Sequence, residues 1–66
     1  MRGFYTAEEC LALAEKFSVL AQCERDDAKH FAEIGLIGTA EMYARRAQLN
    51  EEKALKWSRL AEERAA

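Results

Sequence analysis

The chain has 66 residues, no proline, three glycines and a net charge of −2. The length predicts a single domain, 1–66. The composition is dominated by the strong helix formers Ala, Leu, Glu, Lys and Arg, which predicts an all-helical fold. The near-neutral charge disfavours non-specific binding of nucleic acid. The longest uncharged run, 34–40, is too short to span a membrane, so we expect no membrane association.

The two cysteines bear on the expected compartment. Cys10 and Cys23 are 13 residues apart, which is about 20 Å along one helix, so they cannot form a disulfide with each other there. No segment combines a charged start, an apolar middle and a small-residue exit, as a signal peptide does. We therefore expect a cytoplasmic protein whose two thiols are reduced and packed.

The first predicted helix covers about 6–34. Thr6 and Glu9 have the spacing of a capping box at its start. Apolar residues then recur at steps of three and four, as in a helix that buries one stripe. The predicted stripe contains Cys10, Leu13, Phe17, Leu20, Phe31 and Ile34. The same steps pass through Glu24 and Asp27, so the register continues through a charged patch.

The segment 35–39 contains two of the three glycines, Gly35 and Gly38, and separates the two predicted helices. Gly35 suits the left-handed position that follows a helix, and Thr39 suits the cap of a second helix over 39–65. Connections of this length join antiparallel helices, so we predict a helical hairpin. The alternative is one long helix that contains Gly35 and Gly38, each at a cost of about 1 kcal/mol relative to alanine.

The second predicted helix has a stripe with steps of three and four without exception. It consists of Ala40, Tyr43, Ala47, Asn50, Ala54, Trp57 and Ala61. The small residues of this stripe allow a second helix to approach closely. Folding the chain near residues 36–37 places Phe31 opposite Tyr43. The same register brings together three further pairs: Glu24 and Asn50, Asp27 and Arg46, and Phe17 and Trp57.

A two-helix hairpin buries one stripe per helix and is marginally stable alone. The apolar residues expected to stay exposed are Leu11, Val19, Leu36, Ile37, Leu49 and Leu55. We therefore predict a homodimeric four-helix bundle. Its predicted function is that of a non-enzymatic module without a cofactor, which self-associates or binds a helical protein partner. The predicted interface residues are Leu13, Phe17, Leu20, Phe31, Ile34, Tyr43, Trp57 and Leu60.

Glu24, Asp27 and His30 form the candidate metal site, at steps of three. Asp27 and His30 have the carboxylate-x-x-His spacing of metal sites in ferritin-like bundles, which use glutamate and need further carboxylates from neighbouring helices. One alternative is therefore a metal-binding bundle in which a partner chain contributes Glu24. The other interpretation is a polar layer that sets the register. A dimeric nucleic-acid regulator, based on the scattered basic residues of the second helix, is the third alternative.

Two stretches resemble parts of a tetratricopeptide or Sel1-type repeat. They are Phe31-Ala-Glu-Ile34-Gly35 and the segment 51–61, which contains Ala54 and Ala61. The resemblance implies a role in binding peptides or proteins. It also implies three helices, with turns at 22–27 and at Leu49–Asn50.

Overall fold

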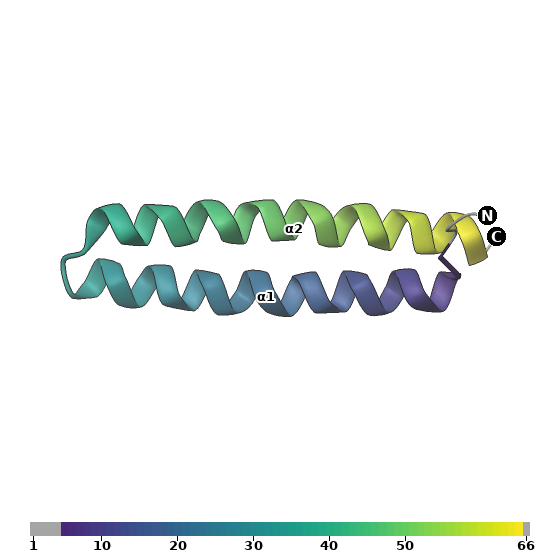
Figure 1. Cartoon of the computed structure of the whole chain (residues 1–66), viewed down its shortest axis with the longest axis horizontal. Coiled ribbons are helices and arrows are strands. Elements are labelled where there is room, and N and C mark those ends of the chain that lie inside the picture. The colour runs from purple at the N-terminus through teal and green to yellow at the C-terminus, as the bar shows by residue number, and fades with distance from the viewer. Residues whose placement is uncertain (1–4, 66) are drawn as a thin grey trace.

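The structure, a computed structural model, describes residues 5–65 and contains two long helices, α1 (Ala7–Glu33) and α2 (Ile37–Ala65). They run antiparallel side by side, so that the start of α1 lies near the end of α2 (Figure 1). The predicted helical hairpin is therefore confirmed. The three-helix alternative is wrong, because both helices continue without a break through 22–27 and through Leu49–Asn50.

The predicted capping box starts α1. The Thr6 hydroxyl oxygen accepts a hydrogen bond from the Glu9 amide at 3.1 Å. The Glu9 carboxylate in turn accepts one from the Thr6 amide at 2.8 Å. Two amides that the first turn leaves without a helical partner are thereby satisfied, which fixes the helix start at Ala7.

Gly35 ends α1 as predicted, with a φ of +88° that side-chain-bearing residues rarely adopt. The Gly35 amide donates to the Ala32 carbonyl at 3.1 Å, and the Leu36 amide donates to the Phe31 carbonyl at 2.8 Å. This pair of bonds is a Schellman motif, which satisfies carbonyls at the end of the helix. Only residues 34–36 lie between the two helices.

The predicted start of α2 at Thr39 is wrong, because the helix begins at Ile37. The Leu36 carbonyl already accepts the Ala40 amide at 2.9 Å. Leu36 thus closes α1 through its amide and opens α2 through its carbonyl. This leaves Gly38 and Thr39 inside the first turn of α2, where Thr39 is too late in the chain to act as the cap.

The predicted stripe of α2 is confirmed at every position. Four alanines at intervals of seven residues are buried: Ala40, Ala47, Ala54 and Ala61. The three residues between them are half-buried: Tyr43, Asn50 and Trp57. The alanines allow the two helix backbones to approach closely, while the larger side chains fill the edges of the contact.

The predicted stripe of α1 is correct in part, and Leu20, Asp27 and Ile34 are the predicted positions that lie exposed. Cys10 is buried, and Phe17, Glu24 and Phe31 are half-buried. The positions between them are taken by three alanines: Ala14, Ala21 and Ala28. Of the residues predicted there instead, Leu13 is half-buried, as Ala14 is, whereas Leu20 is 40% exposed, Ile34 is 56% exposed and Asp27 is exposed. Alanine suits this line, because the facing stripe of α2 is itself built on alanines.

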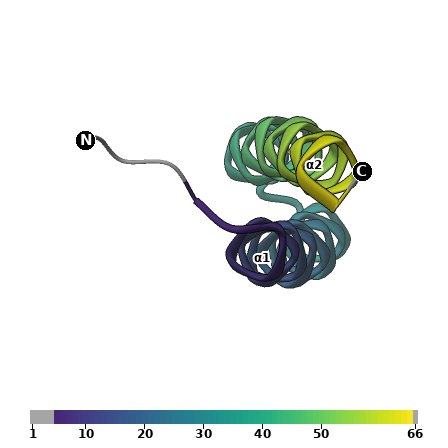
Figure 2. The same ribbon diagram turned by 90° about the vertical axis from the view of Figure 1, so that its right-hand side faces the viewer.

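The hairpin has a core of small residues. Within residues 5–65 the buried side chains are Cys10 and five alanines, and every large apolar side chain is half-buried or exposed. The molecule measures 47 × 17 × 12 Å, so it is a single layer of two helices whose broad faces are both open (Figure 2). Neither described helix is long and apolar enough to cross a membrane.

Candidate functional site

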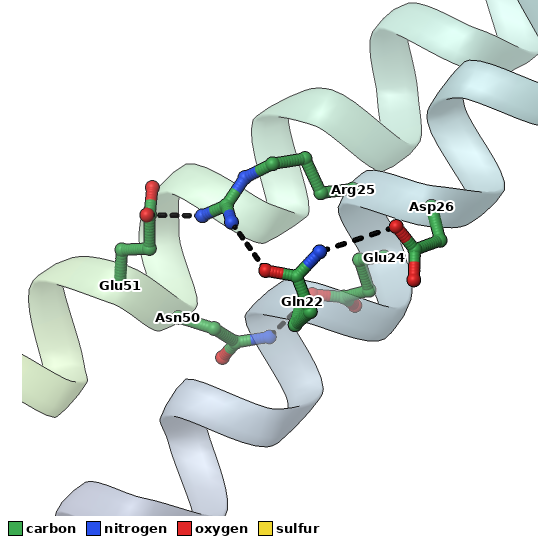
Figure 3. A network of polar contacts seen from close by, with 6 residues as sticks. All are labelled: Gln22, Glu24, Arg25, Asp26, Asn50 and Glu51. Atoms are coloured by element: carbon green, nitrogen blue, oxygen red, sulfur yellow. Dashed lines mark hydrogen bonds and ion pairs between the residues drawn. The ribbon is translucent and has the colours of Figure 1, made fainter.

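A polar layer joins the two helices at mid-length, as the sequence predicts for Glu24 and Asn50 (Figure 3). The Asn50 side-chain amide donates to the Glu24 carboxylate at 2.6 Å, and this contact is partly buried. A hydrogen bond to a charged acceptor stabilises more than a neutral one. Because this layer interrupts a line of apolar residues, it favours one register of α1 against α2.

Beside this layer, Arg25 of α1 forms an ion pair with Glu51 of α2 (Figure 3). Its guanidinium also donates to the Gln22 side-chain carbonyl at 2.9 Å. The Gln22 amide donates in turn to Asp26 at 3.1 Å. Both side chains of the ion pair are about half exposed. The pair therefore contributes about 0–1 kcal/mol to stability, and we do not count it as a functional site.

The structure does not gather the predicted metal ligands within one chain. Glu24 is half-buried and bonded to Asn50, whereas Asp27 and His30 are exposed. Among residues 5–65 no group of three or more His, Cys, Asp or Glu side chains is placed to hold a metal ion. Coordination by Asp27 and His30 together with Glu24 of a second chain stays a prediction, because it depends on an assembly of chains.

Aromatic contacts connect the helices on both sides of the polar layer. The rings of Phe31 and Tyr43 stack at a centroid distance of 5.3 Å, which confirms the predicted pairing. The Arg46 guanidinium lies 5.4 Å from the Tyr43 ring, while Asp27, its predicted counterpart, is exposed. Lys53 lies over the ring of Phe17 at 5.4 Å. These cations belong to one side of α2, so they give that side of the hairpin a basic character.

At the open end of the hairpin, Trp57 meets Tyr5 edge-to-face with ring centroids 5.1 Å apart. Arg64 donates to the Tyr5 carbonyl at 2.7 Å. Tyr5, which precedes α1, is thereby attached to α2. Of the cysteines, Cys10 is fully buried nearby, as predicted, whereas Cys23 is exposed, so the prediction of a packed thiol is wrong there.

One broad side of the hairpin is apolar, and we call it the leucine face. It contains Leu13 and Leu20 of α1, Ile34 at the C-cap of α1, and Leu60 of α2. All four were predicted as interface residues. The α1 members are seven or fourteen residues apart, so they lie in one line along the helix. Asp27 occupies the remaining position of that line. The α1 part of the face is therefore apolar except for one carboxylate, and the α2 part carries the cations Arg46 and Lys53, which lie fourteen and seven residues before Leu60.

The opposite side carries a groove between the helices, which we call the acidic groove. Its α1 wall is Leu11, Ala14, Glu15 and Ser18, and its α2 wall is Gln48, Glu51, Glu52, Ala54, Leu55 and Ser58. Its volume is about 880 Å³. Leu11 and Leu13 point in directions about 200° apart around α1, because successive residues differ by about 100°. The acidic groove and the leucine face therefore lie on opposite sides.

The sequence interpretation missed the acidic groove, although a signal was present. Ala14 and Ser18 are four residues apart on α1, and Ala54 and Ser58 repeat this spacing on α2. Small residues four apart lie on one side of a helix and leave a depression there.

The six apolar residues that were expected to stay exposed, Leu11 and Leu55 of this groove among them, are 49–59% exposed.

Comparison with known proteins adds no relative. No protein-family model matches the chain, and no curated protein or solved structure is significantly similar to it. The resemblance of 31–35 and 51–61 to a tetratricopeptide or Sel1-type repeat thus has no support from these comparisons.

Proposed function

We propose that this chain is a non-enzymatic self-association module that forms a homodimeric four-helix bundle through its leucine face. One observation carries the proposal: within the described hairpin no large apolar side chain is buried. A core of alanines supplies little hydrophobic free energy, and two helices alone are marginal. A second hairpin laid on the first converts a half-exposed apolar surface into the core of a bundle.

The leucine face suits a two-fold dimer because such an interface brings a surface against its own copy. Burying the remaining exposed parts of Leu20 and Ile34 contributes about 1 kcal/mol for each residue in each chain. Asp27, between them, supplies a polar group where the partner's basic α2 side chains can reach it. A polar residue within an apolar line is a known way to set register and oligomer state.

The acidic groove does not suit the same role. A two-fold axis through it would bring the carboxylates of Glu15 and Glu52 of one chain close to those of its partner, beside Glu51, which is paired with Arg25. Like charges held together at an interface oppose association. The leucine face instead carries charges of both signs, Asp27 on α1 and Arg46 and Lys53 on α2, so its charge opposes association less than that of the acidic groove.

Native mass spectrometry of the untagged chain tests this proposal, because it reports the number of subunits and any retained metal. We expect a metal-free dimer. Leu20→Glu places a carboxylate on the leucine face and should give a monomer, and Leu20→Ala should weaken the dimer in the same direction. Val19→Glu is the matched control, since Val19 is 57% exposed and points away from α2.

Three results would contradict the proposal. A wild-type monomer at all concentrations would exclude self-association. A Leu20→Glu dimer as stable as the wild type would exclude the leucine face. A stoichiometric metal that is needed for assembly would instead support the metal-binding bundle based on Glu24, Asp27 and His30.

A further inference from the structure

The acidic groove is long enough to accommodate one short helix. Its lining includes four small side chains, Ala14 and Ser18 from α1 and Ala54 and Ser58 from α2, of which Ala54 is buried and Ala14 and Ser58 are half-buried. Leu11 and Leu55 stand at its sides and are 56% and 59% exposed. Its α2 wall spans residues 48–58, which is about 15 Å of helix axis or nearly three turns. A short helix of similar length therefore fits along it.

The charge of the groove indicates the charge of the ligand that it binds. Three of its ten lining residues are glutamates, of which Glu51 is paired with Arg25, and within the described chain no Lys, Arg or His is among the lining residues. Glu15 lies on the α1 wall and Glu52 on the α2 wall, so carboxylates flank the small side chains on both sides. This arrangement attracts basic side chains and repels the phosphates of nucleic acid. The complementary ligand is a helix with a small apolar face between two rows of cations.

We propose that the acidic groove binds a basic amphipathic helix of a partner protein. Leucine and alanine side chains of that helix pack between Leu11 and Leu55, in the helix-in-groove manner of peptide recognition. Its lysine or arginine side chains meet Glu15 and Glu52. The proposal goes beyond self-association, because the leucine face lies on the other side of the hairpin and remains available for a second copy.

A synthetic peptide provides the test. The probe is a fluorescein-labelled helical peptide of leucine, alanine and lysine, with leucine and alanine on one face and lysines beside it. Its control has glutamate in place of every lysine. We expect fluorescence anisotropy to show binding of the lysine peptide to the full chain and at least about tenfold weaker binding of the glutamate peptide. Raising the salt from about 0.02 to 0.15 M should weaken the lysine peptide, because exposed charges are screened.

Charge reversal locates the site. The double variant Glu15→Lys/Glu52→Lys should weaken the lysine peptide by about tenfold or more. The control Glu33→Lys/Glu63→Lys changes the net charge by the same amount at exposed positions outside the groove, and it should retain most of the affinity. An equal loss in both variants, equal binding of both peptides, or no binding of the lysine peptide would overturn the proposal.

Two further outcomes separate this proposal from self-association. Leu20→Glu should remove the dimer and leave peptide binding intact, because Leu20 is on the opposite side from the groove. Conversely, Glu15→Lys/Glu52→Lys should leave the subunit number unchanged. If that variant alters the subunit number while the lysine peptide fails to bind the wild type, the groove is a contact between copies and the partner helix is excluded.

Discussion

At the scale of single residues, two glycines three positions apart have opposite roles. Gly35 has a φ of +88° and ends α1, whereas Gly38 lies in the first turn of α2, and a Cβ at either position meets nothing within 4 Å. Gly35→Ala should therefore lower the free energy of unfolding by about 1–2 kcal/mol through backbone strain alone. Gly38→Ala should raise it by up to about 1 kcal/mol, because alanine favours helix. Urea denaturation followed by circular dichroism measures both changes.

The two variants act as controls for each other, since they make the same chemical change on the same short segment. Equal effects of the same sign would contradict the assigned conformations. The sequence was sufficient to predict the role of Gly35, because a glycine after a long helical pattern commonly takes the left-handed position. It was insufficient for Thr39, whose side chain suits a cap. The decisive factor was a backbone arrangement in which Leu36 serves both helices.

At the scale of the helices, the alanine contact determines how closely α1 and α2 approach. Ala47 is 2% exposed at the centre of this contact, whereas Ala44, on the same helix, is exposed. Ala47→Leu should lower the free energy of unfolding by about 1–3 kcal/mol, because the added carbons force the helices apart. Ala44→Leu should change it by less than about 0.5 kcal/mol. A greater loss at Ala44 than at Ala47 in thermal or urea denaturation would contradict this arrangement.

The polar layer gives a second prediction for the paired helices. Asn50→Ala removes the donor that Glu24 bonds at 2.6 Å and leaves its partly buried carboxylate without that partner. We expect a loss of about 1–3 kcal/mol. The double variant Glu24→Ala/Asn50→Ala should lose less than the sum of the two single variants, and the difference measures their coupling. Strict additivity in urea denaturation would show that the bond does not stabilise the hairpin.

The α1 stripe shows why sequence periodicity predicted only part of this contact. Steps of three and four from Cys10 through Phe17 fit either Leu13 and Leu20 or Ala14 and Ala21 as the intervening positions. Hydrophobicity favours the leucines, whereas the structure half-buries both Leu13 and Ala14 and buries Ala21 in place of Leu20. The choice depends on the facing helix, because a stripe of alanines on α2 brings the backbones close and leaves no space for leucine. Such complementarity is a property of the pair and is not visible in α1 alone.

At the scale of the whole molecule, the position of the surfaces was harder to predict than the fold. The hairpin follows from two periodic stripes and one turn. The acidic groove combines residues 11–18 with residues 48–58, and these approach each other only once the rotation of each helix about its axis is known. That rotation places Leu11 and Leu55 on one side of the hairpin and Leu20 on the other. The exposed apolar residues are therefore divided between two distinct surfaces.

The melting temperature of a thin hairpin with a core of alanines shows whether the fold depends on a second copy. If folding is completed by a second copy, the melting temperature must depend on chain concentration, because association favours the folded state by mass action. For a dimer of this size, a tenfold dilution should lower the melting temperature by about 5 °C. Leu20→Glu should melt at a lower temperature that does not depend on concentration, and Val19→Glu should behave as the wild type does. A wild-type melting temperature that stays constant over a hundredfold dilution would mean that the alanine contact and the polar layer of Glu24 and Asn50 suffice for folding. The leucine face would then be left without a role in stability.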